Sequence, residues 1–401
     1  MKCTHLIVSL MVACIGLAAT DARAARQGSR YVMAGRCAGL PAVQLKLAKG
    51  FCAGLAASGL GLPRGVLPLA DGRVLVTDLG GWEESRGRLL ALVPKRDGYT
   101  PQVLLTGLDR PHGLQQGPDG RVYLGEATRI LRLQLEHTPP DVEVVIGGLP
   151  AEGRHPLKQF AFGPDGALYV NQGASTDHCE NASPPRPGAP ARCPEAERKA
   201  PGAALWRYTF ANGRWIGQPH ARGLRNSMAL AFTPDGTLWQ GENSRDRLPG
   251  GGDSETRPPD ELNLIRAGAH YGWPYCSGTG PFDPTFGRGN CASFARPERL
   301  LPAHSAPLGM IYYDHPAAPA AWRRSLVVAL HGYRRQGHRI VAWPMDKQGR
   351  PARQFQVLVS GWEANARHPL GAPTDVKADA AGRLWVSEDR NGTLLVISPM
   401  P

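Results

Sequence analysis

The stretch Gly117-Pro118-Asp119-Gly120-Arg121-Val122-Tyr123-Leu124 carries a phrase that the chain repeats. Its other copies are Asp71-Gly72-Arg-Val-Leu-Val, Asp165-Gly166-Ala-Leu-Tyr-Val, Asp235-Gly236-Thr-Leu-Trp and the degenerate Ala381-Gly382-Arg-Leu-Trp-Val. Each copy places a tight turn before an alternating apolar run, which is the sequence form of a β-hairpin. Copies of one phrase along a single chain indicate an internal repeat.

The spacing of the repeat predicts the fold. The turn glycines at 72, 120, 166 and 236 are 48, 46 and 70 residues apart, which fits blades of four short strands with insertions in the later ones. Segments 325–330 and 338–343 lack the phrase but form a sixth strand pair. We therefore predict an all-β, six-bladed β-propeller of four-stranded antiparallel blades. A β-sandwich would not explain the repeat. The one short helix that we expect spans residues 42–49.

The N-terminal segment predicts export. Lys2 precedes an apolar run from Leu6 to Ala19, and Ala22-Arg23-Ala24 then offers a site for signal peptidase. We expect residues 1–24 to be removed, leaving 25–401 as a single periplasmic or secreted propeller domain with an N-terminal extension at 25–50. Neither this run nor a later one is long enough to span a membrane. An imperfect lipobox before Cys14 leaves lipid anchoring as an alternative.

Six cysteines remain once Cys3 and Cys14 are set aside. They stand in three pairs about fifteen residues apart: Cys37 and Cys52, Cys179 and Cys193, Cys276 and Cys291. In an exported chain this spacing suits three local disulfides, although free buried thiols remain an alternative.

The net charge of +12 raises the question of a nucleic-acid partner. The arginines are scattered among turns and form no long basic run, and no basic patch is interleaved with aromatic residues. We therefore expect no nucleic-acid partner. The sequence does not indicate the oligomeric state.

Counting back from the turn glycines places polar residues in the loops that enter the innermost strands. His155 and Arg225 each fall eleven residues before their glycine, and Arg64, His112 and Thr374 fall eight before theirs. In a propeller these loops converge at one end of the central channel, so we expect a site there.

Two of these loops carry chemically useful side chains. His155, in Gly153-Arg154-His155-Pro156, is a candidate general base because an unperturbed histidine has a pKa of about 6.5. Arg225 and Asn226 could hold a polarised carbonyl or a carboxylate. A structural histidine and a loop clamp are the alternatives at these positions.

The segment from Gly241 to Pro274 is rich in oxygen ligands. It contains Gly241-Glu-Asn-Ser244-Arg245-Asp246, an insert with Asp253 and Glu255, and Pro258-Pro-Asp260-Glu261-Leu-Asn263. Carboxylates and carbonyls on a turn-rich loop suit Ca²⁺, which takes six to eight oxygens. A solvated acidic loop without an ion is the alternative. Zinc, serine-nucleophile, P-loop and nicotinamide-binding motifs are missing from the sequence.

Six phrases resemble the pyrroloquinoline quinone (PQQ) dependent sorbosone dehydrogenase family, which is related to soluble quinoprotein glucose dehydrogenase. They are Arg110-Pro-His-Gly-Leu114 with Gly117-Pro-Asp-Gly120, Gly153-Arg-His-Pro156, Gly223-Leu-Arg-Asn226, Pro258-Pro-Asp-Glu-Leu-Asn263, Tyr271-Gly-Trp-Pro274 and His304-Ser-Ala-Pro-Leu-Gly309. They stand in family order, and the resemblance runs from about Phe51 to the C-terminus.

The resemblance implies a role for each matching residue. His155 would take the proton of the substrate hydroxyl, Arg225 would polarise the quinone carbonyl and Asn226 would contact PQQ. The carbonyls of Ser244 and Arg245 would bind the Ca²⁺ next to the cofactor. A second, structural Ca²⁺ would lie on Asp260, Glu261 and the carbonyl of Tyr271.

The chain also departs from the family pattern. The acidic residue before the base is Arg154, and the sugar-site aspartate aligns with Ala174. The two segments that supply cations to the PQQ carboxylates have become His331-Gly-Tyr-Arg334-Arg335 and Ala372-Pro-Thr374-Asp-Val376. Arg334, Arg335 or Arg367 would have to replace the missing cations.

These features together predict a quinoprotein dehydrogenase that oxidises an aldose or a related sugar or aldehyde, using PQQ, Ca²⁺ and an external electron acceptor. Two alternatives remain. One is a Ca²⁺-dependent lactonase on a similar scaffold, and the other is a binding propeller without enzymatic activity that has lost PQQ.

Overall fold

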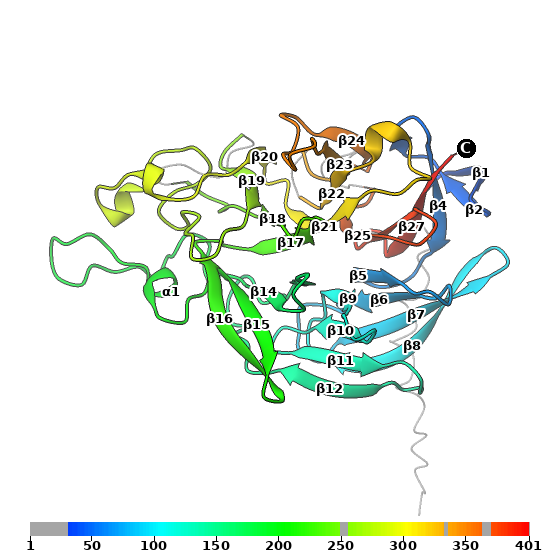
Figure 1. Cartoon of the computed structure of the whole chain (residues 1–401), viewed down its shortest axis with the longest axis horizontal. Coiled ribbons are helices and arrows are strands. Elements are labelled where there is room, and N and C mark those ends of the chain that lie inside the picture. Colours follow the sequence, from blue (N-terminus) through cyan, green and yellow to red (C-terminus); the bar gives the residue numbers. More distant parts are fainter. Residues whose placement is uncertain (1–30, 249–255, 333–335, 363–369, 401) are drawn as a thin grey trace, which may run out of the picture.

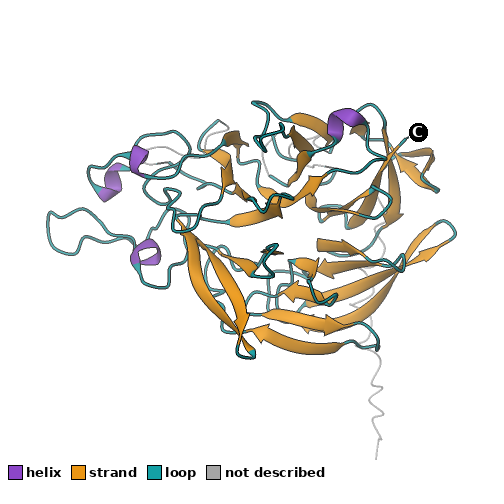
Figure 2. Cartoon of the chain, viewed as in Figure 1, coloured by secondary structure: helices purple, strands orange, loops and turns teal. Residues whose placement is uncertain are grey.

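A computed structural model describes residues 31–248, 256–332, 336–362 and 370–400. Six antiparallel sheets stand around a central axis as the blades of a propeller (Figures 1 and 2). The predicted six-bladed β-propeller is therefore confirmed. The expected signal peptide lies outside the described residues, as do Asp253, Glu255, Arg334, Arg335 and Arg367.

The first three blades follow the chain without a crossover, each running from its inner to its outer strand. Their strands are β5 (Pro63–Pro68), β6 (Val74–Asp78), β7 (Gly87–Lys95) and β8 (Gly98–Leu108); β9 (Leu114–Gln116), β10 (Val122–Gly125), β11 (Ile130–Gln134) and β12 (Asp141–Ile146); and β13 (Phe160–Phe162), β14 (Leu168–Gln172), β15 (Ala204–Ala211) and β16 (Arg214–Arg222).

Blades four to six continue this order, and the last two recruit strands from the N-terminal part of the chain. Their strands are β17 (Ser227–Phe232), β18 (Leu238–Glu242), β19 (Pro259–Leu264) and β20 (Arg299–Ala303); β21 (Pro307–Tyr313), β22 (Ser325–Leu330), β23 (Arg339–Pro344), β24 (Gln356–Ser360) and β3 (Lys46–Leu47); and β25 (Pro373–Ala378), β26 (Leu384–Glu388), β27 (Thr393–Pro399), β4 (Phe51–Ala57), β2 (Leu40–Val43) and β1 (Met33–Cys37).

The N-terminal strands close the ring. β4 pairs antiparallel with the C-terminal β27, so that the last blade joins both ends of the described chain, and β3 adds a strand to blade five. The helix predicted at residues 42–49 was wrong, because β2 and β3 cover four of these eight residues and none of the eight is helical. Val43 is buried and packs in the core between blades five and six. The segment therefore buries an apolar side chain as part of a strand and not as part of a helix.

The repeated phrase forms the same kind of turn in the five blades that carry it, which are all but blade five. In blade two, Gly120 has φ of 76°, a left-handed conformation that favours glycine, and Asp119 Oδ1 accepts a hydrogen bond from the N–H of Arg121 at 3.1 Å. In the degenerate copy, the carboxylate of Asp379 has the corresponding role and accepts hydrogen bonds from the N–H groups of Ala381 and Arg383. Each turn sends the chain from the inner strand into the second strand of its blade.

Apolar side chains fill the spaces between neighbouring blades. Leu75 and Leu89 of blade one pack with Leu124 and Leu131 of blade two, and all four are almost fully buried. Burial at about 25 cal/mol per Å² of apolar surface makes such contacts the main source of stability. Trp239 of blade four and Trp343 of blade five meet in the same way.

Two disulfide-closed inserts extend from blades three and four, and the predicted pairings are confirmed as Cys37–Cys52, Cys179–Cys193 and Cys276–Cys291. The inserts lie against each other, and the hydroxyl of Tyr275 donates to Glu197 at 2.9 Å. The short helices are α1 (Pro194–Glu197), η1 (Pro284–Phe286), η2 (Cys291–Ser293) and η3 (Ala320–Trp322). None of the helices in the described residues has the length and apolar character to cross a membrane.

Candidate active site

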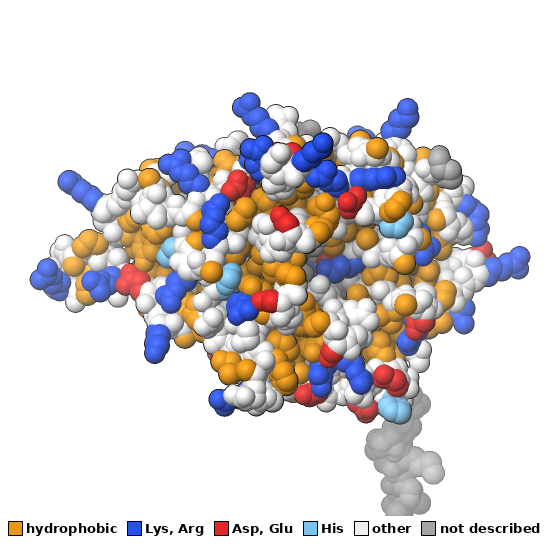
Figure 3. All heavy atoms as spheres, viewed as in Figure 1, with side chains coloured by type: hydrophobic (Ala, Val, Ile, Leu, Met, Phe, Trp, Pro, Cys, Tyr) orange, Lys and Arg blue, Asp and Glu red, His pale blue; other side chains and the backbone are white. Residues whose placement is uncertain are grey.

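Two sets of loops meet at one end of the propeller channel. One set enters the innermost strands, and the other leaves the second strands, because antiparallel neighbours return the chain to the end from which it came. Together they line a cavity of about 430 Å³, whose walls are Leu62, Arg64, Leu79, Trp82, Arg154, His155, Pro156, Leu157, Asn226, Met228, Leu308, His331, Asp389 and Arg390. Figure 3 shows that this view of the molecule is hollowed near its centre and rich in basic side chains.

The predicted base lies in the wall of this cavity. Nδ1 of His155 is 2.6 Å from the carbonyl oxygen of Ala174, a contact in which the ring nitrogen must carry the proton. Nε2 is then the unprotonated nitrogen. Burial and the charge of Arg225 lower the pKa of His155 to about 3, against the opposing effect of the hydrogen bond to Ala174. The ring is therefore neutral at ordinary pH and can accept a proton.

Two glycines let the His155 loop lie close to the end of β14. A Cβ on Gly173 would come within 2.5 Å of the Cβ of His155, and a Cβ on Gly153 would come within 2.1 Å of the carbonyl oxygen of Ser175. Gly153 also has φ of 81°. The backbone approach that positions His155 therefore depends on the missing side chains at these two positions.

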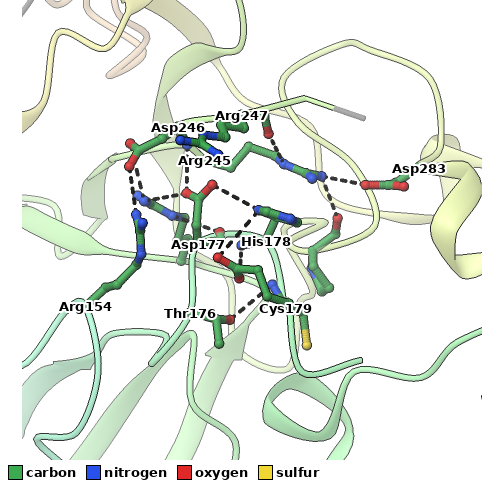
Figure 4. Close-up of polar contacts among 12 residues, drawn as sticks. Arg154, Thr176, Asp177, His178, Cys179, Arg245, Asp246, Arg247 and Asp283 are labelled. Atoms are coloured by element: carbon green, nitrogen blue, oxygen red, sulfur yellow. Dashed lines mark hydrogen bonds and ion pairs between the residues drawn. The ribbon is translucent and has the colours of Figure 1, made fainter. Parts of the chain in front are cut away.

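Arg225 does not line the cavity within the described part of the chain, because protein groups hold its guanidinium. Nη2 is 2.7 Å from Asp177 Oδ1, and Nε and Nη1 donate to the carbonyls of Asp177 and Asn243, each at 3.0 Å. Figure 4 shows Asp177 at the centre of these contacts, beside Asp246. Burial alone would raise the pKa of Asp177, but Arg225 holds it below its usual range. The role of Arg225 at the quinone stays a prediction.

The carboxylate of Asp177 also lies near His178 and Glu180, and the three ligand atoms fall within 4.8 Å of one another. Because the cationic Arg225 is already paired with Asp177, we assign no metal to this group.

Asn226 lines the cavity, and its side-chain oxygen is an unsatisfied hydrogen-bond acceptor among the described residues. Its side-chain Oδ1 is buried and accepts no hydrogen bond from any described residue. Its backbone N–H donates to Glu242 Oε1 at 3.0 Å, which fixes the loop. Burial raises the pKa of Glu242 to about 8, with a further contribution from Glu261. A buried acceptor without a partner is what a bound polar ligand would complete, so the position fits contact with a cofactor.

Ser244 and Arg245 do not line this cavity, and their predicted role at the Ca²⁺ stays a prediction. Across the described ranges, no residue donates a hydrogen bond to either carbonyl oxygen. Two unpaired carbonyls on consecutive residues suit a hard cation such as Ca²⁺. Asp260 Oδ1 accepts from the N–H of Ser244 at 2.8 Å, and Asp283 Oδ2 pairs with the guanidinium of Arg245 at 2.7 Å, so both ligand residues are anchored.

The second calcium site has a less direct geometry. Asp260 and Glu261 are consecutive residues of β19, so their side chains point to opposite faces. Asp260 accepts from Ser244 and Ala306, whereas Glu261 accepts from Gly278 and Asn263. The carbonyl oxygen of Tyr271 accepts no hydrogen bond among the described residues. This three-residue site stays a prediction.

The segment 372–376 is one of the two that would supply cations according to the resemblance, and it offers none at residues 372 and 374. Ala372 and Thr374 are fully buried, and neither lines the cavity. The hydroxyl of Thr374 donates to the carbonyl of Pro63 at 2.9 Å. The substitutes Arg334, Arg335 and Arg367 lie outside the described residues.

Five charged or titratable residues of the cavity were missing from the predicted site: Arg64, Arg154, His331, Asp389 and Arg390. Arg64 had the expected offset, but nothing in its motif pointed to a function. His331, Asp389 and Arg390 follow the second strands of blades five and six. Counting forward from Gly382 would have found the loop of Asp389 and Arg390, whereas blade five has no copy of the phrase from which to reach His331.

The family model described as TrAA12-like matches residues 45–400, which is most of the chain. The chain belongs to the TrAA12-like family. The match includes strands of all six blades and leaves out only β1 and β2 of the described strands.

Solved structures agree with this assignment at the level of the fold. The calcium structure of the Carbohydrate-Active Enzymes Family AA12 protein of Trichoderma reesei superposes with a TM-score of 0.73 at 19% identity, covering 93% of this chain and 98% of that chain. The holo form of the PQQ domain of pyranose dehydrogenase from Coprinopsis cinerea gives 0.70 at 19% identity, covering 90% and 99%. The expected structural similarity to PQQ-dependent sugar dehydrogenases is thus confirmed.

A curated relative matches over a shorter range. An uncharacterised protein of Borreliella burgdorferi strain B31 is 30% identical over 179 residues, which is 42% of this chain and 45% of that protein. The chain therefore aligns with less than half the length of the curated relative that it matches.

Proposed function

We propose that the chain is an exported quinoprotein dehydrogenase that oxidises an aldose or a related sugar or aldehyde with PQQ and Ca²⁺. The observation that carries the proposal is the pairing of two features in one cavity: a histidine whose Nε2 is free to accept a proton, and the buried, unsatisfied Oδ1 of Asn226. Membership of the TrAA12-like family supports the same chemistry.

The proposed proton acceptor is Nε2 of His155. The carbonyl of Ala174 fixes the tautomer, so the substrate hydroxyl would donate its proton to Nε2 while Nδ1–H remains bonded. The carbonyl of Ala174 would also stabilise the imidazolium that forms, since its hydrogen bond favours the charged ring. A base with a low pKa gives the proton up readily, which suits its return to solvent before the next turnover.

When bound, PQQ supplies a two-electron acceptor for the hydride of the substrate carbon. Asn226 would contact it, and the carbonyls of Ser244 and Arg245 would hold the Ca²⁺ beside it. Arg225, positioned by Asp177, would add positive charge near the cofactor. Leu62, Leu79 and Leu308 would exclude water from the apolar wall of the cavity.

The cavity disfavours the lactonase alternative. A metal-dependent hydrolase of that kind needs several oxygen ligands deep in the channel. Among the described residues that line this cavity, Asp389 is the one carboxylate, and it already pairs with Arg64 and His331.

The three disulfides are consistent with a location outside the cytoplasm, where such bonds persist. Within this proposal the mature protein is periplasmic or secreted, and it passes its electrons to an external acceptor.

The test adds PQQ and Ca²⁺ to the purified apoprotein and follows dye reduction over a panel of aldoses, sugar aldehydes and lactones. The proposal expects dye reduction with at least one aldose or sugar aldehyde only when PQQ is present. Lactone hydrolysis without PQQ would favour the hydrolase instead, and activity with neither class would favour a binding propeller.

A further inference from the structure

One side of the cavity gathers groups from three blades into a single polar network. Arg64 begins blade one, His331 follows the second strand of blade five, and Asp389 follows that of blade six. Asp389 Oδ2 is 2.6 Å from Arg64 Nη1, and Asp389 Oδ1 is 2.9 Å from His331 Nε2. The neighbouring Arg390 lines the same wall.

The guanidinium of Arg64 is fixed in place but is not fully used. Only 5% of the residue is exposed, and Nε donates to Nδ1 of His112 at 3.2 Å. His112 is fully buried, and burial together with the charge of Arg64 holds its pKa well below the usual range, so it accepts as a neutral ring. Nη2 of Arg64 donates to no described residue. A planar guanidinium held at Nε and Nη1 keeps Nη2 available for another acceptor.

The cavity as a whole is positive. Its lining includes three arginines (Arg64, Arg154 and Arg390) against one carboxylate (Asp389), a difference of 3 − 1 = 2 with the two histidines left out of the count. Such an excess of guanidinium groups around a confined space favours a ligand with several carboxylates.

Arg64 also lies beside the segment 372–376, which lacks the cation that the resemblance implies there. The hydroxyl of Thr374 donates to the carbonyl of Pro63, and it lies 3.3 Å from the carbonyl of Arg64. The start of blade one is therefore packed directly against the segment 372–376 of blade six, where the resemblance implies a cation.

We propose that Arg64, held by Asp389 and His112, supplies a carboxylate-binding cation in place of the one that the resemblance implies in the segment 372–376, so that this cavity binds a planar polycarboxylate through blade one. Within the proposed function that ligand is PQQ, and the inference rests on that function. Arg390 would assist from the neighbouring loop. Asp389 holds Arg64 in place but adds a negative charge to the site.

The network gives the two partners opposite expected effects. Loss of Arg64 removes a charge-assisted hydrogen bond to the ligand, which should weaken binding by about tenfold or more. Loss of the charge on Asp389 removes repulsion of an anionic ligand, so binding should not weaken. If the ion pair were merely structural, the loss of Arg64 and the loss of the charge on Asp389 would weaken binding to the same extent.

The experiment measures the Kd of PQQ by titration calorimetry on the apoprotein in the presence of Ca²⁺. The variants are Arg64→Met, Arg64→Lys and Asp389→Asn, each checked by its melting curve. The matched control is Arg88→Met, because Arg88 forms a similar ion pair with the buried Asp78 in the same blade and does not line the cavity.

The expected result is weaker binding in Arg64→Met, partial recovery in Arg64→Lys, wild-type affinity in Arg88→Met and equal or tighter binding in Asp389→Asn. If Arg64→Met does not fold, the comparison of Arg64→Lys with Asp389→Asn decides. Equal affinity in Arg64→Met and Arg88→Met, or an equal loss in Arg64→Met and Asp389→Asn, would overturn the inference alone. A wild-type protein that binds no PQQ would overturn the proposed function and this inference with it.

Discussion

The carbonyl of Ala174 accepts from Nδ1 of His155 at 2.6 Å, while the N–H of the same residue donates to the carbonyl of Arg225 at 2.8 Å. One residue at the end of β14 thus joins the loop of the candidate base to the loop that carries Arg225 and Asn226. The resemblance to the sorbosone dehydrogenase family implied an acidic side chain at this position. In this chain, the backbone of Ala174 bonds to both loops.

The first prediction concerns the base. His155→Ala should lower kcat by about 10²- to 10⁴-fold, because the proton of the substrate hydroxyl loses its acceptor. Affinity for PQQ, measured by titration, should change little. The exposed His137 provides the control, and His137→Ala should behave as the wild type. A loss of less than about tenfold in kcat for His155→Ala would refute the assignment.

The pH dependence of activity follows from the environment of His155. Since burial and Arg225 lower its pKa to about 3, the ring remains a base from about pH 5 to about pH 8. The log of kcat/KM should therefore show no acid limb near the ordinary histidine pKa. An acid limb centred near pH 6.5 that is lost in His155→Ala would contradict the burial of the ring.

Lys158 supports the same loop from inside the protein. The residue is fully buried, and Nζ donates to the carbonyls of Pro150 at 2.8 Å and Pro156 at 2.7 Å. Lys158→Met would release the segment on both sides of His155, so kcat should fall without loss of PQQ binding. The measurement is a kinetic comparison with Lys347→Met, whose lysine is exposed.

Lys158 should also affect how the free energy of unfolding depends on pH. Burial and the charge of Arg110 lower its pKa to about 7, well below that of the unfolded chain. Between these two pKa values the unfolded state binds more protons, so the stability that Lys158 contributes rises with pH and is lost as pH falls toward 7. Denaturant unfolding of wild type and Lys158→Met should diverge by up to about 1.4 kcal/mol per pH unit above pH 7. Parallel curves would contradict a buried, neutral amine.

Asp177→Asn tests the buried ion pair that orients Arg225. The two side chains are only 4% and 2% exposed, and loss of one charge leaves the other unpaired at a cost of about 3–5 kcal/mol. The control is Asp346→Asn, which breaks an exposed pair with Arg350 and should cost much less. Similar losses in urea unfolding for both variants would mean that Arg225 does not depend on Asp177.

Calcium should stabilise the folded protein. Binding at a hundredfold excess over Kd contributes about 2.7 kcal/mol, so the melting temperature should rise with Ca²⁺ and fall with chelator. Glu261→Gln should weaken the response, and His155→Ala should leave it unchanged. An unaltered melting curve after chelation, together with no calcium by elemental analysis, would remove the ion from the account.

The fold was predictable because the repeated turn is a local device. Asp119 and Gly120 form their turn from contacts within a few residues, so the phrase is legible in the sequence wherever it recurs. The segment at 42–49 was misread because its strands depend on partners in β4 and β24, which lie far away in the sequence. Tertiary pairing overrode the local pattern there.

The candidate site was only partly predictable for a related reason. His155 and Asn226 occur in recognisable sequence motifs, and both line the cavity. Asp389 follows a strand without any distinctive motif, and its importance arises from Arg64 and His331, which other blades supply. No residue spacing in the sequence predicts that side chains from these three blades come into contact.

The most direct test of the account is a single-turnover measurement on the reconstituted protein without an electron acceptor. The apoprotein is loaded with PQQ and Ca²⁺, freed of unbound cofactor by gel filtration, and mixed with aldoses in the absence of oxygen while the absorbance of the quinone is followed. The account predicts one PQQ per chain and its full reduction by at least one aldose or sugar aldehyde, with the reduction about a hundredfold slower in His155→Ala. A protein that retains no PQQ, or whose bound PQQ no sugar reduces, would contradict it.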